Sequence, residues 1–383
     1  MTPAVWSRLN LQEKILEIKQ KRASSQPLPV GAAPYTSAAH FKIQSSSSKP
    51  SARRWDFHFS DVACEHSVSL LKTAAAAKGP DDMITCGTGR PAAEFYPWTM
   101  LALRTKSEQH ENFDTTCTVG KTAFDLAVAL NYGYSAGSPR LLRYITEHVE
   151  LIHDPLYAYW DCAITAGTSS AIDLTLQILC NPGNHVLVEE YTYPGTIDAL
   201  KPQRLNKVAV TMDEEGLVPV ELDSQLRQWD ATKGKKPSVL YMIPTGHNPI
   251  GITQPLERRR QIYAVAEAHN LLIIEDGPYM FLQLRPELNA AYNHRNLTPE
   301  DRYLAGLPTS YLSLDTSKRN IRLDSTSKSL VPGLRCGWIT ASSQVVAKFL
   351  TRIEVSVVSA NGLSQAMLYK LLDESWGHDG FVR

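Results

Sequence analysis

Residues 324–338 of the chain read DSTSKSLVPGLRCGW, a short hydroxyl-rich turn with a lysine and, seven residues later, an arginine. The turn follows an apolar run, so we expect it to begin where a strand ends. A lysine that is partly buried, or near another cation, can lose its proton and form a Schiff base, and Lys328 is the candidate. Guanidinium and hydroxyl groups bind phosphate, which here indicates Arg335, Ser325 and Ser327. Taken alone, the segment is explained equally well by a surface lysine and arginine in a serine-rich loop.

On both sides of this turn, short apolar runs alternate with segments of helical periodicity. The runs that we expect to be strands are 186–188, 239–243, 271–274, 311–314, 321–323 and 337–339. Helices are expected over 171–179 and 256–269. Continuous apolar strands separated by helices are typical of an α/β fold with a largely parallel sheet covered on both faces. Ligands of such sheets bind beyond the carboxyl ends of the strands, so the site should lie there.

Three further segments with polar groups follow apolar runs. They read IEDGPY at 274–279, PTGHNPIG at 244–251 and ITAGTSSAI at 164–172. In the first, Asp276 lies at a strand end, where a carboxylate can keep a pyridine nitrogen protonated and so maintain an electron sink. In the last, a glycine and hydroxyl residues open a helix, whose free N–H groups attract an anion. Considered one at a time, helix caps and Pro/Gly turns account for all three segments.

In this combination and order, the segments resemble those of the class I and II aminotransferases, pyridoxal-phosphate (PLP) enzymes of fold type I. The resemblance covers most of residues 80–383. It implies a large domain with a mostly parallel seven-stranded sheet covered by helices. It also implies that Lys328 holds pyridoxal 5'-phosphate as a Schiff base and moves the substrate proton, and that Arg335, Ser325 and Ser327 bind the cofactor phosphate.

The remaining cofactor roles also follow from the resemblance. Asp276 matches the aspartate that binds the pyridine nitrogen. Tyr279 and Asn248 match the residues that reach the phenolic oxygen of the ring. The asparagine segment departs from the family in one place, because Ile250 stands where the family has threonine or serine.

The family also places the cofactor phosphate at a helix that matches Gly167, Thr168 and Ser169. An aromatic residue that stacks on the pyridine ring corresponds to Tyr193. The three helix residues and Tyr193 are therefore expected to complete the cofactor site.

Two more residues are assigned through the resemblance. Tyr132 matches a tyrosine that reaches the phosphate of the partner subunit, which implies a homodimer with shared active sites. Gly89, in the segment CGTGRPAAEFYPW at 86–98, is the candidate for contact with the substrate, because glycines let a substrate approach the backbone. The Phe-Tyr-Pro-Trp form of this segment is similar to fungal aromatic and kynurenine/2-aminoadipate aminotransferases.

Composition excludes several classes of protein. The 383 residues carry no net charge, which gives no overall attraction to nucleic acid or to a membrane surface. No apolar run reaches the roughly 18 residues that a membrane span needs, and residues 1–20 lack the apolar core of a signal peptide. The six cysteines have no metal-ligand spacing, so we expect no metal site, reduced thiols and a cytoplasmic protein.

The chain is expected to have four parts. They are a flexible tail at 1–55, with a short charged helix near 11–22, an N-terminal segment of the small domain with a substrate-facing loop at 56–115, a large PLP-binding domain at 116–345, and the start of a C-terminal small domain at 346–383. In the family, the arginine that binds the substrate α-carboxylate lies beyond this last part. The resemblance therefore implies a small domain that is incomplete at its C-terminus, and no residue takes that role.

The sequence thus predicts a PLP-dependent aminotransferase that moves an amino group between an aromatic or related L-amino acid and a 2-oxo acid. Alternatives share the same cofactor residues: a C–S lyase or an ACC-synthase-like enzyme of fungal secondary metabolism, or a truncated paralogue with impaired catalysis. A PLP-binding regulatory domain is disfavoured, because about 55 low-complexity residues cannot form a DNA-binding domain. The sequence does not fix the donor, the acceptor or the pathway.

Overall fold

The structure is a computed structural model. It describes residues 10–31, 33, 35–43, 49–50, 54–65, 89–105, 114–120, 124–283 and 297–382. Within these ranges no helix is both long enough and apolar enough to cross a membrane. The cysteines that lie in them are all free thiols.

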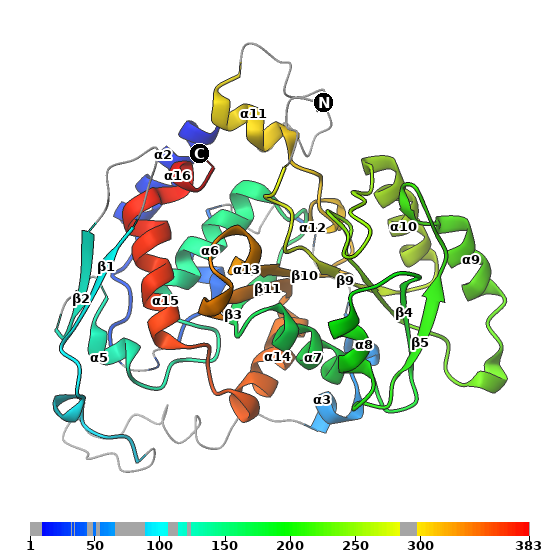
Figure 1. Cartoon of the computed structure of the whole chain (residues 1–383), viewed down its shortest axis with the longest axis horizontal. Coiled ribbons are helices and arrows are strands. Elements are labelled where there is room, and N and C mark those ends of the chain that lie inside the picture. Colours follow the sequence, from blue (N-terminus) through cyan, green and yellow to red (C-terminus); the bar gives the residue numbers. More distant parts are fainter. Residues whose placement is uncertain are drawn as a thin grey trace.

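A seven-stranded sheet forms the centre of the molecule (Figure 1). Its strands, in spatial order, are β3 (Trp160–Thr165), β11 (Gly337–Ser342), β10 (Asn320–Ser325), β9 (Leu272–Asp276), β8 (Val239–Met242), β4 (His185–Glu189) and β5 (Asn206–Val210). Only β11 runs antiparallel to its neighbours. The mostly parallel sheet is therefore confirmed, while β3 and β5 were not identified from the apolar runs.

Helices cover the sheet, and some of them lie beyond one of its ends. They are α2 (Leu11–Ser24), α3 (Asp61–Glu65), α5 (Leu126–Ala129), α6 (Pro139–Ile152), α7 (Thr168–Leu179), α8 (Pro194–Leu200), α9 (Pro219–Arg227), α10 (Leu256–Ala268), α11 (Pro299–Gly306), α12 (Tyr311–Leu314), α13 (Thr326–Ser329), α14 (Ser343–Ser356), α15 (Gly362–Tyr369) and α16 (Gly377–Val382). A π-helical stretch, Lys370–Trp376, joins the last two. Figure 1 shows α9 and α10 at one end of the molecule, and α15 at the other, beside the hairpin β1 (Met100–Arg104) and β2 (Asp114–Thr118). A small two-stranded ladder joins β6 (Met212–Asp213) to β7 (Gly216–Leu217).

Alternate residues of the central strands pack into two separate apolar cores, one on each face of the sheet. Ile274 on β9 and Leu323 on β10 pack in a core that also contains residues of α7 and α14. Ile273, the neighbour of Ile274, packs instead with residues of α9, α10 and α12. The two faces of the sheet are thus buried independently, and consecutive residues at the strand ends point to opposite faces.

One expected strand is wrong. Residues 311–314 form the helix α12, because the hydroxyl of Ser310 accepts a hydrogen bond from the backbone N–H of Ser313 and caps its first turn. The carboxylate of Glu275 accepts two more, from the N–H groups of Tyr311 (3.1 Å) and Leu312 (3.3 Å). A short apolar run does not by itself distinguish a buried helix from a strand. Here the hydrogen bonds to Ser310 and Glu275 favour the helix.

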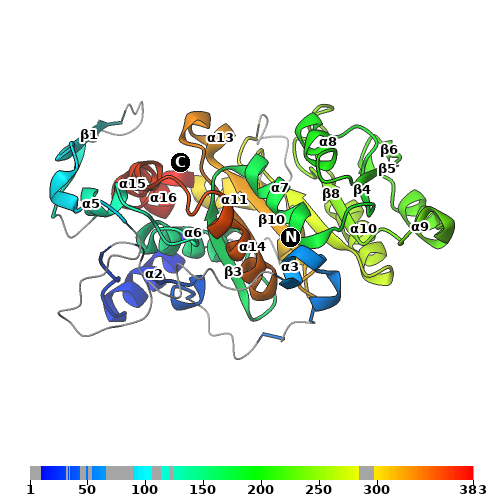
Figure 2. The same ribbon diagram turned by 90° about the horizontal axis from the view of Figure 1, so that it is seen from below.

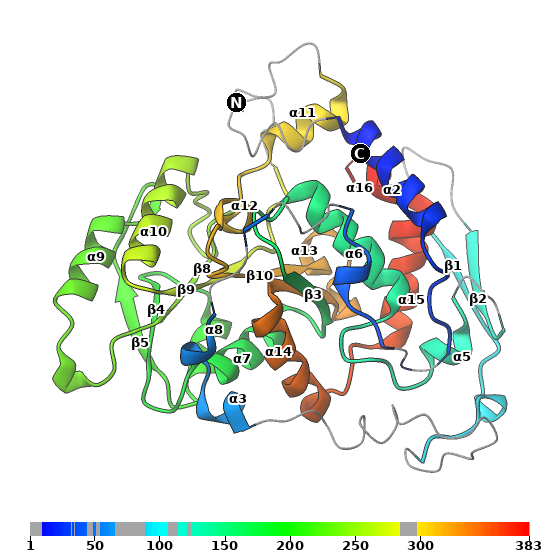
Figure 3. The same ribbon diagram turned by 180° about the vertical axis from the view of Figure 1, so that it is seen from behind.

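The short helix expected near residues 11–22 is confirmed as α2, but it is packed on the protein and does not belong to a flexible tail. Leu11, Ile15 and Ile18 lie on one face of α2 and are buried against residues of α6, α11 and α16. Figure 3 shows α2 beside α16. At the end of α2, Arg22 forms ion pairs with Glu147 and Asp373. The apolar spacing and these ion pairs fix a segment that composition alone indicated to be loose.

Candidate active site

The strand register brings the sequence motifs to one edge of the sheet. Leu323 on β10 is paired with Asp276 on β9, and Ser325, two residues later, is paired with Gly337 on β11. Gly337 in turn is paired with Thr165, the last residue of β3. The motifs that follow β3, β9 and β10 therefore start from adjacent positions, as expected for a site at the carboxyl edge.

A candidate corner for an anion lies where α7 begins. Gly167 precedes the first turn of α7 with φ of +89°, and no side chain caps that turn. The guanidinium of Arg335 lies against Gly167, so closely that a Cβ there would stand 2.6 Å from Nη2. Arg335 also donates to the hydroxyl of Ser327 at 3.3 Å. Free helix N–H groups beside a guanidinium are suited to a phosphate, and only glycine leaves room for the arginine.

Lys328 lies in the same corner, on the short helix α13 that projects from the end of β10 (Figure 2). The hydroxyl of Ser325 accepts a hydrogen bond from the N–H of Ser327 at 3.1 Å and so caps α13. The Lys328 side chain is exposed, whereas Ser325 is buried. The structure thus brings Lys328, Arg335, Ser325 and Ser327 together, and Thr168 and Ser169 occupy the first turn of α7 opposite them.

Asp276 lies at the buried end of β9 with its two carboxylate oxygens in different surroundings. Oδ2 accepts a hydrogen bond from the Tyr241 hydroxyl at 2.8 Å. Oδ1 is buried and has no hydrogen-bond partner among the residues that the structure describes. Burial raises the pKa of Asp276 to about 6, the nearby Asp324 adds to this rise, and Tyr241 and Arg322 oppose it. A buried oxygen with no donor is a strained arrangement that a protonated ring nitrogen would relieve.

A buried ionic network lies on the opposite face, one residue away. Arg322 donates to Glu275 at 2.7 Å and, through two nitrogens, to Asp324. Asn320 donates to the same glutamate at 2.8 Å. Sequence reasoning missed this network and Tyr241. The available signal was the presence of charged and phenolic groups inside apolar runs, since such groups are buried only with partners.

A buried arginine forms hydrogen bonds with both ends of the loop that carries Asn248. Arg259 on α10 donates to the carbonyl oxygens of Pro244 (2.8 Å) and Gln254 (3.0 Å), one at each end of the loop. Asn248 itself is half-buried and is followed by a cis peptide bond to proline. Tyr279 packs across Gly246 in the same loop, where a Cβ would stand 3.0 Å from that of Tyr279. Tyr279 therefore lies against the loop that carries Asn248.

Tyr193 is half-buried at the start of α8 and packs on the main core. Its ring lies directly over Gly195, where a Cβ would meet the ring at 2.5 Å. A tyrosine fixed in this way has a defined ring plane, which stacking on a flat ligand requires. The strand β4 that precedes it ends at the same edge of the sheet as β9, to which it is linked through β8.

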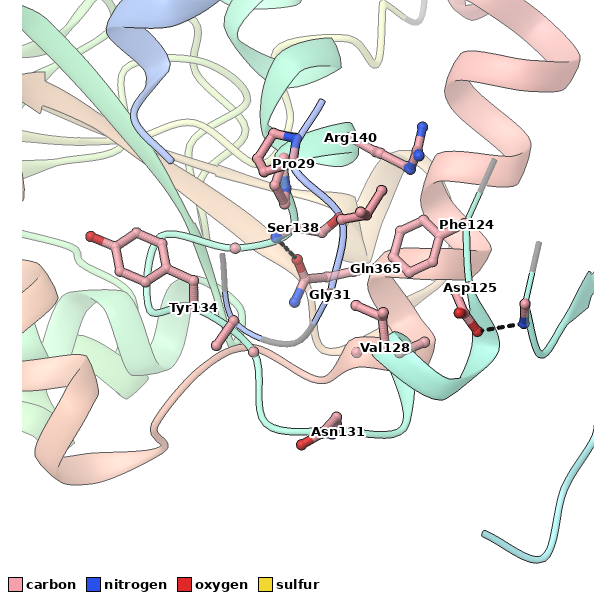
Figure 4. A pocket seen from close by; sticks show the side chains of 18 residues that line it. Pro29, Gly31, Phe124, Asp125, Val128, Asn131, Tyr134, Ser138, Arg140 and Gln365 are labelled. Carbon is pink, nitrogen blue, oxygen red and sulfur yellow. Dashed lines mark hydrogen bonds between the residues drawn. The ribbon is translucent and has the colours of Figure 1, made fainter. Parts of the chain in front are cut away.

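Two expected residues have no contact with this cluster among the residues that the structure describes. Gly89 is exposed, with φ of +56°, and no atom of a described residue lies within 4 Å of where its Cβ would be. Tyr132 is also exposed and lines a cavity of about 290 Å³ together with residues 357–363. A neighbouring cavity of about 300 Å³ lies between the N-terminal segment at Pro29 and the helices α5, α6 and α15 (Figure 4). Among its described lining residues are none of those expected at the cofactor.

Comparison with known proteins decides the family. The sequence model of the family "aminotransferase class I and II" matches residues 116–379. The chain belongs to this family. The aminotransferase swnA of Arthroderma benhamiae is 46% identical to this aminotransferase over 337 residues, which is 88% of the chain and 68% of the relative. An aromatic amino acid aminotransferase of Schizosaccharomyces pombe is 34% identical over 341 residues, 85% of the chain and 72% of the relative.

The fold agrees with this assignment. The crystal structure of aminotransferase Aro8 from Candida albicans superposes with a TM-score of 0.80 at 32% identity, covering 87% of this aminotransferase and 73% of that chain. Fold type I is therefore confirmed, and so is pyridoxal 5'-phosphate as the cofactor of the enzyme. The residues present fit the cofactor: Asp276 offers a buried oxygen with no described partner, and the glycine at 167 lets the Arg335 guanidinium lie beside the uncapped first turn of α7.

Proposed function

We propose that this aminotransferase transfers the amino group of an aromatic or related L-amino acid to a 2-oxo acid. The substrate class is supported by the name of the Schizosaccharomyces pombe relative, an aromatic amino acid aminotransferase. It is also supported by the segment before β1, where Phe95 and Trp98 present largely exposed rings that suit an aromatic substrate. Gly89 lies in the same segment and would let the substrate approach the backbone.

The cofactor would be held by the residues at the carboxyl edge. The phosphate would bind to Arg335, Ser325, Ser327 and the first turn of α7 at Gly167, Thr168 and Ser169. Asp276 would hold a proton on the ring nitrogen, Asn248 and Tyr279 would donate to the phenolic oxygen, and Tyr193 would stack on the ring. When bound, PLP supplies an electron sink for negative charge at the substrate Cα.

Lys328 has two tasks in this proposal. Its Nζ is the covalent attachment point of the cofactor, and it is also the base that takes the proton from the substrate Cα and returns it. The exposure of Lys328 on a short helix, capped by Ser325, leaves its side chain free to change position between the two tasks. The observation that carries the role of the site is the buried Asp276 oxygen, which needs a donor that the described residues do not supply.

We also propose a homodimer with shared active sites, in which Tyr132 binds the partner subunit's phosphate. Tyr132 and Val357 are exposed and line the cavity of about 290 Å³, and Val355 is also exposed, as expected for a face that a second copy covers. A test is to mix Tyr132→Phe with Lys328→Ala subunits. Recovery of activity on mixing supports a shared site, and a strict average of the two inactive parents contradicts it.

The division into a large domain at 116–345 and small-domain segments at 56–115 and 346–383 is part of the same proposal. A cytoplasmic location is proposed as well, because the cysteines within the described ranges are free thiols, as in a reducing compartment.

The substrate test is a panel of amino donors with several 2-oxo acid acceptors. We expect kcat/KM for tyrosine, phenylalanine, tryptophan or kynurenine to exceed that for aspartate and alanine by at least about tenfold, since a buried ring contributes 1–3 kcal/mol. A preference for aspartate or alanine contradicts the proposed substrate class. Release of ammonia and pyruvate without any acceptor would instead show C–S lyase chemistry.

A further inference from the structure

Tyr241 on β8 forms a hydrogen bond with the Asp276 carboxylate. The Tyr241 side chain is fully buried, and its hydroxyl donates to Oδ2 of Asp276 at 2.8 Å. Tyr241 is paired with Ile274 across the β8–β9 ladder, so its ring lies on the same face of the sheet as Asp276. The ring packs in the main apolar core, and its position is therefore fixed by its surroundings.

This contact determines how the carboxylate is oriented. A carboxylate on a strand end can rotate about its last bond unless a partner holds one oxygen. Tyr241 holds Oδ2, so Oδ1 is left as the buried oxygen with no donor among the described residues. The two oxygens thereby acquire different functions: one faces the protein, and the other faces the site.

The polar and charged groups that act on Asp276 lie on the two neighbouring strands, β8 and β10. Asp324 and Arg322 on β10 act in opposite directions, since the first raises the pKa of Asp276 and the second lowers it. Tyr241 on β8 also lowers this pKa, although burial outweighs both. Burial, followed by the charge of Asp276, raises the pKa of Tyr241 itself well above its usual value. The hydroxyl therefore keeps its proton, and Tyr241 is a permanent donor.

We propose that Tyr241 is a positioning residue that orients the Asp276 carboxylate toward the ring nitrogen of the cofactor and favours its ionised form. The inference rests on the proposed role of Asp276. Without the phenol, both carboxylate oxygens would be buried without a donor, and Asp276 would take up a proton near neutral pH. A protonated Asp276 cannot attract a proton to the ring nitrogen, so the electron sink would weaken.

The first experiment uses the protein without cofactor. Aspartate labelled with 13C at the carboxyl carbon is incorporated, and the Asp276 resonance is identified by its loss in Asp276→Asn. We expect Tyr241→Phe to raise the titration midpoint of this resonance by about one pH unit, because a lost hydrogen bond to a charged group has that size. An unchanged midpoint in a folded variant overturns the inference.

Tyr311→Phe is the matched control. Tyr311 is equally buried, but its hydroxyl donates to Gln254 at 2.9 Å on the other face of the sheet. This variant should leave the Asp276 midpoint unchanged. If it shifts the midpoint as much as Tyr241→Phe does, a general loosening of the fold explains both, and the positioning role is wrong.

The second experiment uses the enzyme loaded with PLP and separates the two proposals. For Tyr241→Phe we expect a fall of about tenfold in kcat with little change in KM, and a steeper loss of activity as pH falls. If Asp276→Asn loses turnover but Tyr241→Phe has a wild-type pH profile, the inference fails and the role of Asp276 stands. If Asp276→Asn has wild-type turnover, the role of Asp276 fails.

Discussion

Glu275 and Asp276 are consecutive carboxylates at the end of β9, and they point to opposite faces of the sheet. Glu275 has partners for both oxygens: Arg322, Asn320 and the first backbone N–H groups of α12. Asp276 has a donor for one oxygen only. Both are buried by similar amounts, so burial alone does not distinguish them.

The difference teaches how a structural carboxylate is told from a functional one. A buried charge that contributes to folding is fully paired, because an unpaired charge in the interior is unfavourable by several kcal/mol. A buried charge with an oxygen that no described residue satisfies destabilises the protein alone and is stabilised by a ligand. We therefore expect the Glu275 face of the sheet to serve the fold and propose that the Asp276 face binds the cofactor.

The largest effect is expected on the cofactor face, from Lys328→Ala. Turnover should fall by about four orders of magnitude, because the variant loses both the attachment point and the base. Treatment with borohydride should no longer fix the cofactor to the chain, while thermal stability stays unchanged. Lys201→Ala, at a lysine that is mostly exposed, is the control and should behave like wild type. A reducible lysine adduct in Lys328→Ala contradicts the assignment.

Asp276→Asn should have the next largest effect, and its two readouts should move in opposite directions. Turnover should fall by about 10²–10³-fold, the size found for a lost electrostatic contact in a site. The protein without cofactor should become more stable at pH 7–8 by up to about 3 kcal/mol.

The sign of the second effect follows from linkage. The pKa of Asp276 is raised to about 6, so the folded state holds its proton more tightly than the unfolded state does. Stability therefore declines as pH rises from about 4 to 6 through this group, and asparagine removes that decline. Urea denaturation at pH 5 and pH 8 measures it. A variant destabilised at both pH values would show that Asp276 is structural, like Glu275.

Glu275→Gln should give the reverse result on the structural face. The substitution leaves Arg322 with one carboxylate, that of Asp324, and weakens the hold on α12, so we expect a loss of about 3 kcal/mol in the free energy of unfolding. Activity measured well below the melting temperature should remain within a few-fold of wild type. Urea denaturation together with kcat tests both statements. Full stability with lost activity would remove the distinction between the two faces.

Arg22→Gln should have the smallest effect of these substitutions. It tests the Glu147 carboxylate, which lies outside the sheet. Burial opposes ionisation of Glu147, but Arg22 and His378 outweigh it, so the pKa of Glu147 lies below its usual value. The variant should lose about 2 kcal/mol at pH 7. A group with a lowered pKa stabilises the fold above its unfolded pKa and loses that contribution in acid, so the difference from wild type should shrink as Glu147 is protonated, leaving the part that comes from the Arg22–Asp373 pair. A difference that does not shrink in acid would show that packing of α2 is responsible.

The sequence predicted candidate site residues that lie in a motif directly after their own strand. It did not predict residues whose hydrogen-bond or ion-pair partners lie on a neighbouring strand. Lys328, Arg335 and Asp276 were predicted as site residues because each lies in a short motif after an apolar run, and the structure brings the ends of those runs to one edge of the sheet; their roles remain predictions. Tyr241, Arg322 and Asp324 were missed, because their partners are set by the register between β8, β9 and β10. The helix at 311–314 was missed for a similar reason, since its cap includes Glu275. Tyr132 and Gly89 remain predictions, because the described contacts do not connect them to the site.

Because β11 runs antiparallel to β10, the length of the segment that joins the two strands is constrained. Ser325 and Gly337 are paired at the bases of β10 and β11, and both the N–H and the hydroxyl of Thr326 donate to the carbonyl of Cys336. The segment between them, with Lys328 near one end and Arg335 near the other, is thus a loop closed at its base. Residues of this segment other than those assigned to the site are open to substitution, but the length of the segment is not, because an inserted residue must displace Lys328 or Arg335. Loop grafting between relatives should therefore succeed here only when the number of residues is kept.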